Sequence, residues 1–433
     1  MSARPIAALL CAACAAALAQ SYEAGWGPNP ALPPAQHTLL PTVNVAPVER
    51  WQGNDKPYAA SGFTVTAYAR DLEHPRWLYV LPNGDVLVAE TNAPPKPEDG
   101  KGIKGAIMKQ QMRKAGAGAA SANRITLLRG VDAQGAARSR STFLKDLHSP
   151  FGMVLVDQEL YVADSDAVLH FPYQEGQTAI SAPGARLLDL PAGPLNHHWT
   201  KNITASPDGR FLYIAVGSNS NAGENGIEKE DGRAAIWEYE RASGKSRLYA
   251  TGLRNPVGMA WEPATHALWT VVNERDELGN DLVPDFLTQV HDGAFYGWPY
   301  SYFGQHLDTR VRPSRPELVA RAVMPDYALG AHTASLGLAF YDGTLFPESW
   351  RGGAFIGQHG SWNRKPFAGY KVVFVPFAAG RPSGPPVDFL AGFLTRDGKA
   401  RGRPVGVAVD KAGALLVADD VGNTVWRVTP AQH

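Results

Sequence analysis

One pattern of residues returns six times along the chain, and this repetition restricts the fold more than any other feature. Each copy has a polar residue, a short apolar run, a turn, a second apolar run, and then acids or amides. The first copy reads "HPRWLYVLPNGDVLVAETN" and the last reads "GRPVGVAVDKAGALLVADD". The copies begin at His74, His148, His198, Leu253, Thr333 and Gly402. The repeat is therefore about 66 residues long, which indicates an array of similar units.

Each copy is expected to form a β-hairpin within a four-stranded sheet. Short turns such as "PNG", "PDG" and "KAG" join the paired apolar runs, and further strand-like runs such as "AAIWEYE" lie between copies. Four short strands per repeat are typical of a propeller blade, so the sequence predicts an all-β, six-bladed β-propeller over residues 61–433. The last copy supplies three strands. We therefore expect "GFTVTAYARDL" (residues 62–72) to complete the last blade and close the ring.

The N-terminus reads as a targeting segment. In "MSARPIAALLCAACAAALAQ" one arginine precedes a short apolar run, and "ALA" comes just before Gln20. This predicts a signal peptide over residues 1–19 and a periplasmic or secreted protein, because the run is too short for a transmembrane helix. The alternative is a lipoprotein signal with a lipid anchor at Cys14. The Pro-rich residues 20–60 are expected to be extended over the surface.

Overall charge excludes some classes of partner. Lysines plus arginines and aspartates plus glutamates number 41 each, so nothing indicates nucleic acid or an anionic membrane as a partner. Function must therefore come from local groups of residues.

The polar residues of the six copies are expected to gather at one mouth of the channel. The innermost strand of each blade lines the channel of a propeller. One polar residue precedes this strand, and the acid or amide cluster follows the next strand. The residues before the inner strands are Arg76, Ser149, His198, Arg254, Thr333 and Arg403. Those after the second strands are Asn92, Asp164, Asn219, Glu274, His359 and Asp419. A concave site with convergent polar groups is the default place for binding or chemistry.

Two adjacent copies carry residues suited to acid–base chemistry. "LNHHWTKNI" supplies His198, and "LRNPVG" supplies Arg254 and Asn255 at the equivalent position of the next copy. An arginine nearby disfavours protonation of a histidine, so His198 is expected to be neutral and able to take a proton from a hydroxyl. Arg254 is expected to stabilise a developing oxyanion. The alternative is that rim residues only cap strands and face solvent.

The acidic loop "NERDELGNDLVPD" (residues 273–285) is a candidate metal site. Its carboxylates suit calcium better than zinc, and the candidate ligands are Glu274, Asp276 and Asp281. An acidic surface loop is the alternative.

Cations and aromatic residues near the mouth favour a flat anionic ligand. Lys201, Arg254, Arg364 and Arg403 are the cations expected to hold a flat polyanion. Trp199 and Trp362 would wall its faces or a sugar ring, unless they only pack between blades.

Several segments together resemble the pyrroloquinoline quinone (PQQ)-dependent sugar dehydrogenases, and most closely the L-sorbosone dehydrogenase-like branch. These segments include "AETNAPPKPEDGKGIKG", "NHHWTKNI", "GLRNPVGMAW", "VNERDELGNDLVPD" and "HGSWNRKPFAGYKV". The resemblance implies a six-bladed propeller with PQQ over the channel mouth and Ca²⁺ on its carbonyl side. It implies that His198 is the base and that Arg254 stabilises the quinone oxyanion. The cofactor-binding residues that we expect are Lys201, Arg254, Asn255, Thr333, Trp362, Arg364, Lys365 and Arg403.

The expected function is PQQ- and calcium-dependent oxidation of an aldose or L-sorbosone-like aldehyde by hydride transfer. No haem motif is present, so electrons are expected to leave to an external acceptor. Two alternatives stay open: a calcium-dependent lactonase on a similar propeller, and a propeller that binds a ligand without catalysis. The density of arginine and lysine around the mouth favours the polyanionic cofactor.

Overall fold

The computed structural model describes residues 25–36, 42–95 and 119–431, and the regular secondary structure of these residues is nearly all β. The predicted signal peptide, with Cys11 and Cys14, lies outside the described residues, as do residues 96–118, which include most of the segment "AETNAPPKPEDGKGIKG". Within the described ranges, the chain has no helix that is both long and apolar enough to cross a membrane.

Six antiparallel sheets form the blades, numbered here in chain order from the inner strand outward. Blade 1 is β4 (Pro75–Val80), β5 (Val86–Glu90), β6 (Arg124–Arg129) and β7 (Ser139–Leu144). Blade 2 is β8 (Met153–Val156), β9 (Glu159–Ala163), β10 (Ala167–Pro172) and β11 (Ala185–Asp189). Blade 3 is β12 (Lys201–Ala205), β13 (Phe211–Val216), β14 (Ala235–Glu240) and β15 (Ser246–Thr251).

The other three blades each recruit a strand from the N-terminal part of the chain. Blade 4 is β16 (Pro256–Trp261), β17 (Leu268–Val272), β18 (Pro284–Gln289), β21 (Tyr327–Ala331) and β1 (Trp26–Gly27). Blade 5 is β22 (Ser335–Phe340), β23 (Ala354–Gln358), β24 (Lys371–Val375), β27 (Val387–Ala391) and β2 (Tyr58–Ala59). Blade 6 is β28 (Pro404–Val409), β29 (Leu415–Asp419), β30 (Thr424–Pro430) and β3 (Phe63–Ala69).

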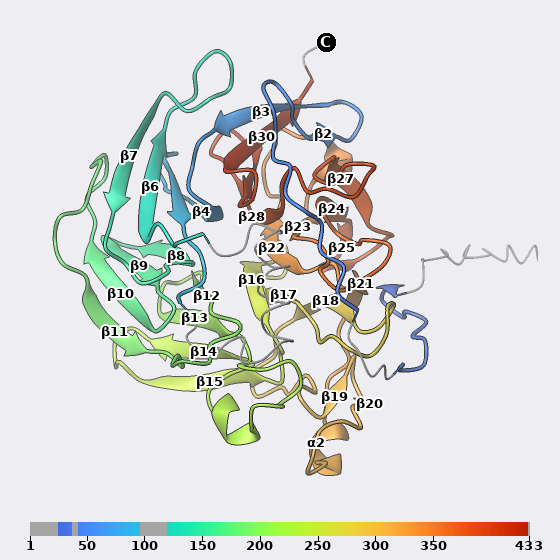
Figure 1. Cartoon of the computed structure of the whole chain (residues 1–433). Coiled ribbons are helices and arrows are strands. Elements are labelled where there is room, and N and C mark those ends of the chain that lie inside the picture. The colour runs from blue at the N-terminus through green and yellow to red at the C-terminus, as the bar shows by residue number, and fades with distance from the viewer. Residues whose placement is uncertain (1–24, 37–41, 96–118, 432–433) are drawn as a thin grey trace, which may run out of the picture.

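The inner strands contact one another in cyclic order, from β4 through β8, β12, β16, β22 and β28 and back to β4. Figure 1 shows the blades arranged around this centre, which confirms the predicted six-bladed β-propeller. The early strand β3 pairs antiparallel with β30, with Val65 opposite Val428. The N-terminal segment adds β1 to the edge of blade 4 and β2 to the edge of blade 5.

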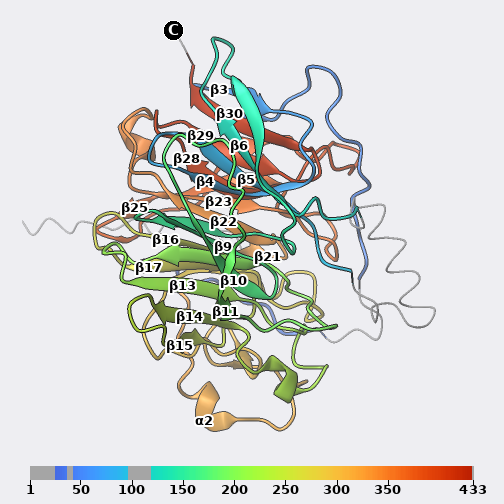
Figure 2. The same cartoon turned by 90° about the vertical axis from the view of Figure 1, so that its left-hand side faces the viewer.

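Smaller elements decorate the ring. They are the two-stranded pairs β19 (Ser301–Tyr302) with β20 (His306–Leu307) and β25 (Phe377–Ala378) with β26 (Arg381–Pro382), the 3₁₀ turns η1 (Ile227–Glu230) and η2 (Glu348–Trp350), and the short helix α2 (Pro316–Val319). Figures 1 and 2 show α2 projecting from one edge of the ring.

The strands read as apolar runs because neighbouring blades cover both faces of each sheet. All five residues of β5 and of β17 are buried, which matches the pattern of fully buried strands rather than a strict alternation. Trp269 in β17 is completely buried and meets the rings of Phe340 and Phe377 edge-on. The core is therefore distributed around the ring between successive blades.

Inner-strand glycines allow adjacent blades to approach closely. A Cβ at Gly337 in blade 5 would clash with the carbonyl oxygen of Val405 in blade 6, and one at Gly406 would lie 2.8 Å from the carbonyl oxygen of Arg76 in blade 1. The contact made by Gly406 joins the last blade to the first. The copies "SLGLAF" and "PVGVAV" therefore keep glycine where the channel wall is tightest.

Replacing Gly337 by alanine is expected to lower the free energy of unfolding by about 1–3 kcal/mol, because the added methyl group forces blades 5 and 6 apart. Denaturant unfolding followed by tryptophan fluorescence measures the change. An unfolding midpoint equal to that of the wild-type protein would contradict this account of blade packing.

Candidate active site

Side chains from different blades meet at the mouth where the inner strands begin. The guanidinium of Arg76, at the start of β4, lies 5.5 Å from the ring centre of Trp199, which precedes β12. Gly217, at the end of β13, lies between His198 and Asn255, and a Cβ at this glycine would clash with both. The predicted gathering of strand-start residues is thus present in the structure.

His198 is held in one orientation by Ser218. Its Nδ1 lies 2.8 Å from the carbonyl oxygen of Ser218 and 3.0 Å from the hydroxyl oxygen of the same residue. The Ser218 hydroxyl donates to the carbonyl oxygen of Ser220 at 2.7 Å. A carbonyl oxygen only accepts, so Nδ1 carries a proton, and when the ring is neutral Nε2 carries the lone pair. This tautomer is the one that a general base requires at Nε2.

The same serine connects His198 to Arg254. The main-chain N–H of Ser218 donates to the carbonyl oxygen of Arg254 at 2.7 Å. Ser218 therefore contacts the imidazole of His198 and the main chain of Arg254, two residues that lie on adjacent blades. The structure brings the two predicted catalytic residues together.

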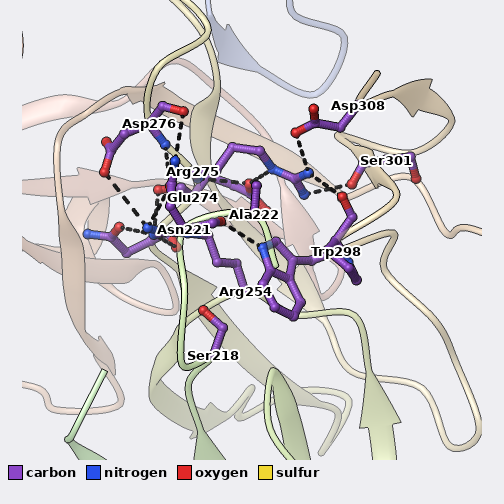
Figure 3. A network of polar contacts seen from close by, with 12 residues as sticks. Ser218, Asn221, Ala222, Arg254, Glu274, Arg275, Asp276, Trp298, Ser301 and Asp308 are labelled. Atoms are coloured by element: carbon purple, nitrogen blue, oxygen red, sulfur yellow. Dashed lines mark hydrogen bonds and ion pairs between the residues drawn. The ribbon is translucent and has the colours of Figure 1, made fainter. Parts of the chain in front are cut away.

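The Arg254 guanidinium is buried and fixed by main-chain and amide oxygens. It donates from Nε to Asn221 O at 3.1 Å, from Nη1 to Glu274 O at 2.7 Å, and from Nη2 to Asn221 Oδ1 at 3.0 Å. Figure 3 shows these groups around the guanidinium, with Trp298 donating to the same Asn221 carbonyl at 3.0 Å. Arg254 therefore offers a rigidly placed positive charge, which is the arrangement that stabilises developing negative charge.

Lys201 does not face the mouth as a surface cation. Its side chain is fully buried, and Nζ lies 3.4 Å from the carbonyl oxygens of His198 and Trp199. Burial lowers the pKa of this amine well below its usual value, and the Arg233 charge adds to the effect. Lys201 therefore binds the main chain of the loop that carries His198.

The three predicted metal ligands do not converge. The Glu274 carboxylate accepts from Nε of Arg275 at 3.0 Å, and the Asp276 carboxylate accepts from His332 and Asn363. Asp281 is exposed and pairs with Arg364. In the described part of the chain, no group of three or more His, Cys, Asp or Glu side chains is arranged to hold a metal ion. Each carboxylate instead has its own cation or amide partner.

Asp276 ties the arginine network to blades 4 and 5. Its Oδ2 lies 3.8 Å from Nη2 of Arg254, and its Oδ1 lies 3.1 Å from Nδ1 of His332. Nδ2 of Asn363 also donates to Oδ1 at 2.7 Å. Asp276 therefore acts as an anchor between loops, with its pKa held below the usual range despite burial.

Most of the other predicted cofactor-binding residues make hydrogen bonds with other residues of the loops around the mouth. Thr333 donates to the buried Asp285 at 2.9 Å. Trp362 is half-buried, and its carbonyl oxygen accepts from the main chain of Asn44. Arg364 and Lys365 are both tied to Asn280, by the guanidinium and by the main-chain N–H respectively. The two contacts with Asn280 join the loop after β23 to the acidic loop.

Arg403 is a buried cation with unused donors. It is 4% exposed, and its guanidinium lies 4.9 Å from the ring centre of Tyr370. Among the described residues this guanidinium makes a single long hydrogen bond, of 3.5 Å from Nη1 to Gly360 O. Within the described residues, its Nε and Nη2 have no hydrogen-bond partner. A buried guanidinium without a counter-ion is costly unless a ligand supplies an anion. Arg403 therefore fits an anionic group bound in the mouth.

Asp420, which was not among the residues predicted from the sequence, contacts three basic side chains near Arg403. Its Oδ2 lies 2.8 Å from Nη1 of Arg76, 2.9 Å from Nε2 of His359 and 3.7 Å from Nδ1 of His74. Asp419, which the sequence predicts at the mouth, accepts from the main-chain N–H of Arg403 at 2.7 Å and from the indoles of Trp51 and Trp426. Ser218 and Asn221 were also missed, although the amide-rich run "GSNSN" marks their position.

Stability should depend on pH through His74. Burial lowers the pKa of His74 from 6.5 to about 4, although the Asp420 carboxylate opposes this shift. The folded state therefore disfavours protonation of His74. The stability that the neutral ring contributes to the folded state is lost as pH falls from about 6.5 through 4. We expect wild type to lose up to about 3 kcal/mol relative to His74→Asn over this range. Asparagine tolerates the positive φ of 58° at this position.

Urea unfolding of both proteins at several pH values measures this difference. The exposed His266, which has a φ of 55°, provides the control variant His266→Asn. A constant difference between wild type and His74→Asn across pH would contradict the prediction.

These features define a six-bladed propeller with a polar, partly unsatisfied site at one channel mouth, and solved structures share the architecture. The PQQ domain of a pyranose dehydrogenase from Coprinopsis cinerea superposes with a TM-score of 0.68 and 22% identity, covering 89% of this chain and all of that one. A Trichoderma reesei structure from Carbohydrate-Active Enzymes Family AA12 superposes with a TM-score of 0.69 and 19% identity, covering 92% of this chain and all of that one.

Sequence relatives extend the comparison. A Borreliella burgdorferi protein of uncharacterised function is 28% identical over 66% of this chain and 77% of its own length. The Escherichia coli aldose sugar dehydrogenase YliI is 33% identical over 31% of this chain and 32% of its own. The PQQ-dependent pyranose dehydrogenase of Coprinopsis cinerea is 24% identical over 76% of this chain and 46% of its own. The TrAA12-like family model matches residues 57–292 and 317–431, so the chain belongs to the TrAA12-like family.

Proposed function

We propose that this chain is a quinoprotein dehydrogenase that binds PQQ at the channel mouth and oxidises an aldose or a sugar-derived aldehyde. The observation that carries the proposal is that Ser218 contacts both the imidazole of His198 and the main chain of Arg254, while a buried Arg403 on another blade has donors without a partner among the described residues. A base, a fixed positive charge and an anion-binding group are the parts such a reaction needs. The names of the Escherichia coli and Coprinopsis relatives support the substrate class and the cofactor.

The mouth residues fit PQQ, a flat molecule with three carboxylates. Arg403 would bind one carboxylate through Nε and Nη2. The buried Asn255, whose Oδ1 has no partner among the described residues, lies near His198 across Gly217. When bound, the quinone supplies an electrophilic carbon that accepts hydride. His198 takes the hydroxyl proton of the sugar at Nε2, while Arg254 provides the positive charge for the oxygen that gains electron density. Electrons then leave to an external acceptor.

We include calcium in the proposal because a similar solved structure is a calcium structure of the Trichoderma reesei AA12 protein. The carboxylates of Glu274, Asp276 and Asp281 do not form its site together, so no step above depends on a metal. We also propose, from the leader sequence, that the protein works in the periplasm or outside the cell. An L-sorbosone-like aldehyde is one substrate to test among the aldoses.

Absorption spectroscopy tests the function directly. Apoprotein mixed with PQQ, with and without calcium, should give a new cofactor spectrum that changes when the right sugar is added, and the mixture should reduce an artificial electron acceptor. A panel of aldoses, pyranoses and L-sorbosone identifies the substrate. No response to any of them would reject the proposal. Chelator-sensitive lactone hydrolysis without PQQ would favour a lactonase instead.

Replacing Arg403 by glutamine is expected to weaken PQQ binding about 10- to 100-fold, because the ligand loses a charged, buried hydrogen-bond donor. Fluorescence quenching by PQQ measures the dissociation constant. Arg401→Gln is the matched control, since Arg401 lies two residues away and pairs with Glu49 outside this cluster. Equal affinities for the two variants would contradict the role of Arg403.

A further inference from the structure

A second imidazole with a defined tautomer lies at the mouth. His359 follows β23, and its Nε2 lies 2.9 Å from Oδ2 of Asp420. The Asp420 carboxylate can only accept, because ion pairing with Arg76 at 2.8 Å favours its charged form. Nε2 of His359 therefore carries the proton, and Nδ1 of the neutral ring carries the lone pair. The side chain is 20% exposed, so the ring can exchange protons with solvent.

The charged groups around His359 come from blades 1 and 6. Arg76 and His74 precede or begin β4, Arg403 precedes β28, and Asp420 follows β29. Burial lowers the pKa of His359, and Arg403 and Arg76 lower it further, while Asp420 opposes them. A neutral ring at rest, with a carboxylate ready to stabilise the protonated ring, is the arrangement of a proton acceptor. His198 differs, because its Nδ1 contacts a carbonyl rather than a carboxylate.

This cluster is continuous with the proposed reaction centre and has unfilled hydrogen-bonding capacity. Arg76 bonds Asp420 with Nη1 and lies over the ring of Trp199, the neighbour of His198. Among the described residues, Nε of Arg76, Oδ1 of Asp420 and two nitrogens of Arg403 have no partner although they are buried. Such atoms on three adjacent side chains indicate that a ligand or ordered water completes the cluster.

We propose that His359, positioned by Asp420, is the second proton acceptor of the mouth. The inference rests on the proposed function. Conversion of a sugar CH–OH group to C=O releases two electrons and two protons. His198 accepts the hydroxyl proton, the two electrons leave to two molecules of an external one-electron acceptor, and the second proton leaves with them through Nδ1 of His359. His359 then passes this proton to solvent.

Stopped-flow measurements separate the two halves of the cycle. Sugar is first added to the PQQ-loaded protein without an acceptor, and the acceptor is then added to the sugar-treated protein. His359→Gln should keep the first rate within about threefold of wild type and should slow the second about tenfold or more. Added imidazole should restore part of the second rate. Asp420→Asn, which removes the carboxylate partner, should show the same asymmetry.

His170 gives the matched control, because its Nδ1 lies 3.0 Å from a carboxylate oxygen of Glu159 on blade 2, in the same kind of pair. His170→Gln should leave both rates unchanged. In the PQQ-free protein, nitrogen-15 NMR near neutral pH should show a neutral His359 ring protonated at Nε2, identified as the signal missing from His359→Gln.

Three outcomes would overturn the inference: equal slowing of both rates in His359→Gln, a raised sugar KM with both rates intact, or an Nδ1-protonated ring by NMR. Failure of the proposed function looks different, because wild type itself would then show no spectral change with PQQ and sugar.

Discussion

Replacing His198 by glutamine should slow sugar oxidation about a thousandfold in the PQQ-loaded protein. Glutamine keeps a polar side chain of similar reach but has no basic nitrogen, so the hydroxyl proton of the sugar has no acceptor. The contact of Nδ1 with the Ser218 carbonyl fixes which nitrogen is basic, and glutamine cannot reproduce that arrangement. The first stopped-flow rate, with sugar and no acceptor, measures the loss.

His197→Gln is the control for this prediction. His197 is the exposed neighbour of His198 in the same loop, and its replacement should change the rate less than threefold. PQQ affinity should be nearly the same in both variants, because the predicted loss concerns proton transfer. If His198→Gln oxidised sugar at the wild-type rate, the base would have to be another residue, and the proposed arrangement of the mouth would be wrong.

The fold was predictable because its information is local and repeated. Each hairpin carries its own turn residues and two apolar runs, and six such units at even spacing allow few arrangements other than a ring. The positions of His198 and Arg254 on adjacent blades were predictable for the same reason, since they are equivalent positions in adjacent repeats; their catalytic roles stay predictions. Aligning the repeats identifies equivalent positions in successive blades even when no side-chain contact is known.

The contacts of individual side chains were not predictable in this way. Asp419 and Asp420 are adjacent in sequence, yet one accepts from two buried indoles and the other binds Arg76 and His359. Successive residues at the end of a strand point to opposite faces, so an error of one residue changes the role completely. The prediction that the acidic loop binds a metal through Glu274, Asp276 and Asp281 failed for a related reason. Composition shows that carboxylates are present, but it does not show that each one is already paired with a cation or an amide.

Replacing Arg254 by lysine should lower sugar oxidation by about 100- to 1,000-fold although the positive charge is kept. The guanidinium donates to Asn221 O, Asn221 Oδ1 and Glu274 O from three nitrogens that lie in one plane. A single ammonium cannot reach all three oxygens, so the loops carrying Asn221 and Glu274 lose their common partner. The positive charge is then no longer held in the place that these three oxygens fix for the guanidinium.

Arg247→Lys separates this effect from a general intolerance of lysine. Arg247 also makes a forked contact, with both oxygens of Asp292, but it is exposed on the outer strand of blade 3. Its replacement should leave activity within about twofold, since exposed ion pairs contribute little. In Arg254→Lys the rate with sugar alone should fall while PQQ still binds through Arg403. A variant that lost PQQ binding and kept its rate at saturating PQQ would instead make Arg254 a cofactor-binding residue only, because charge stabilisation in the reaction requires a loss in the rate itself.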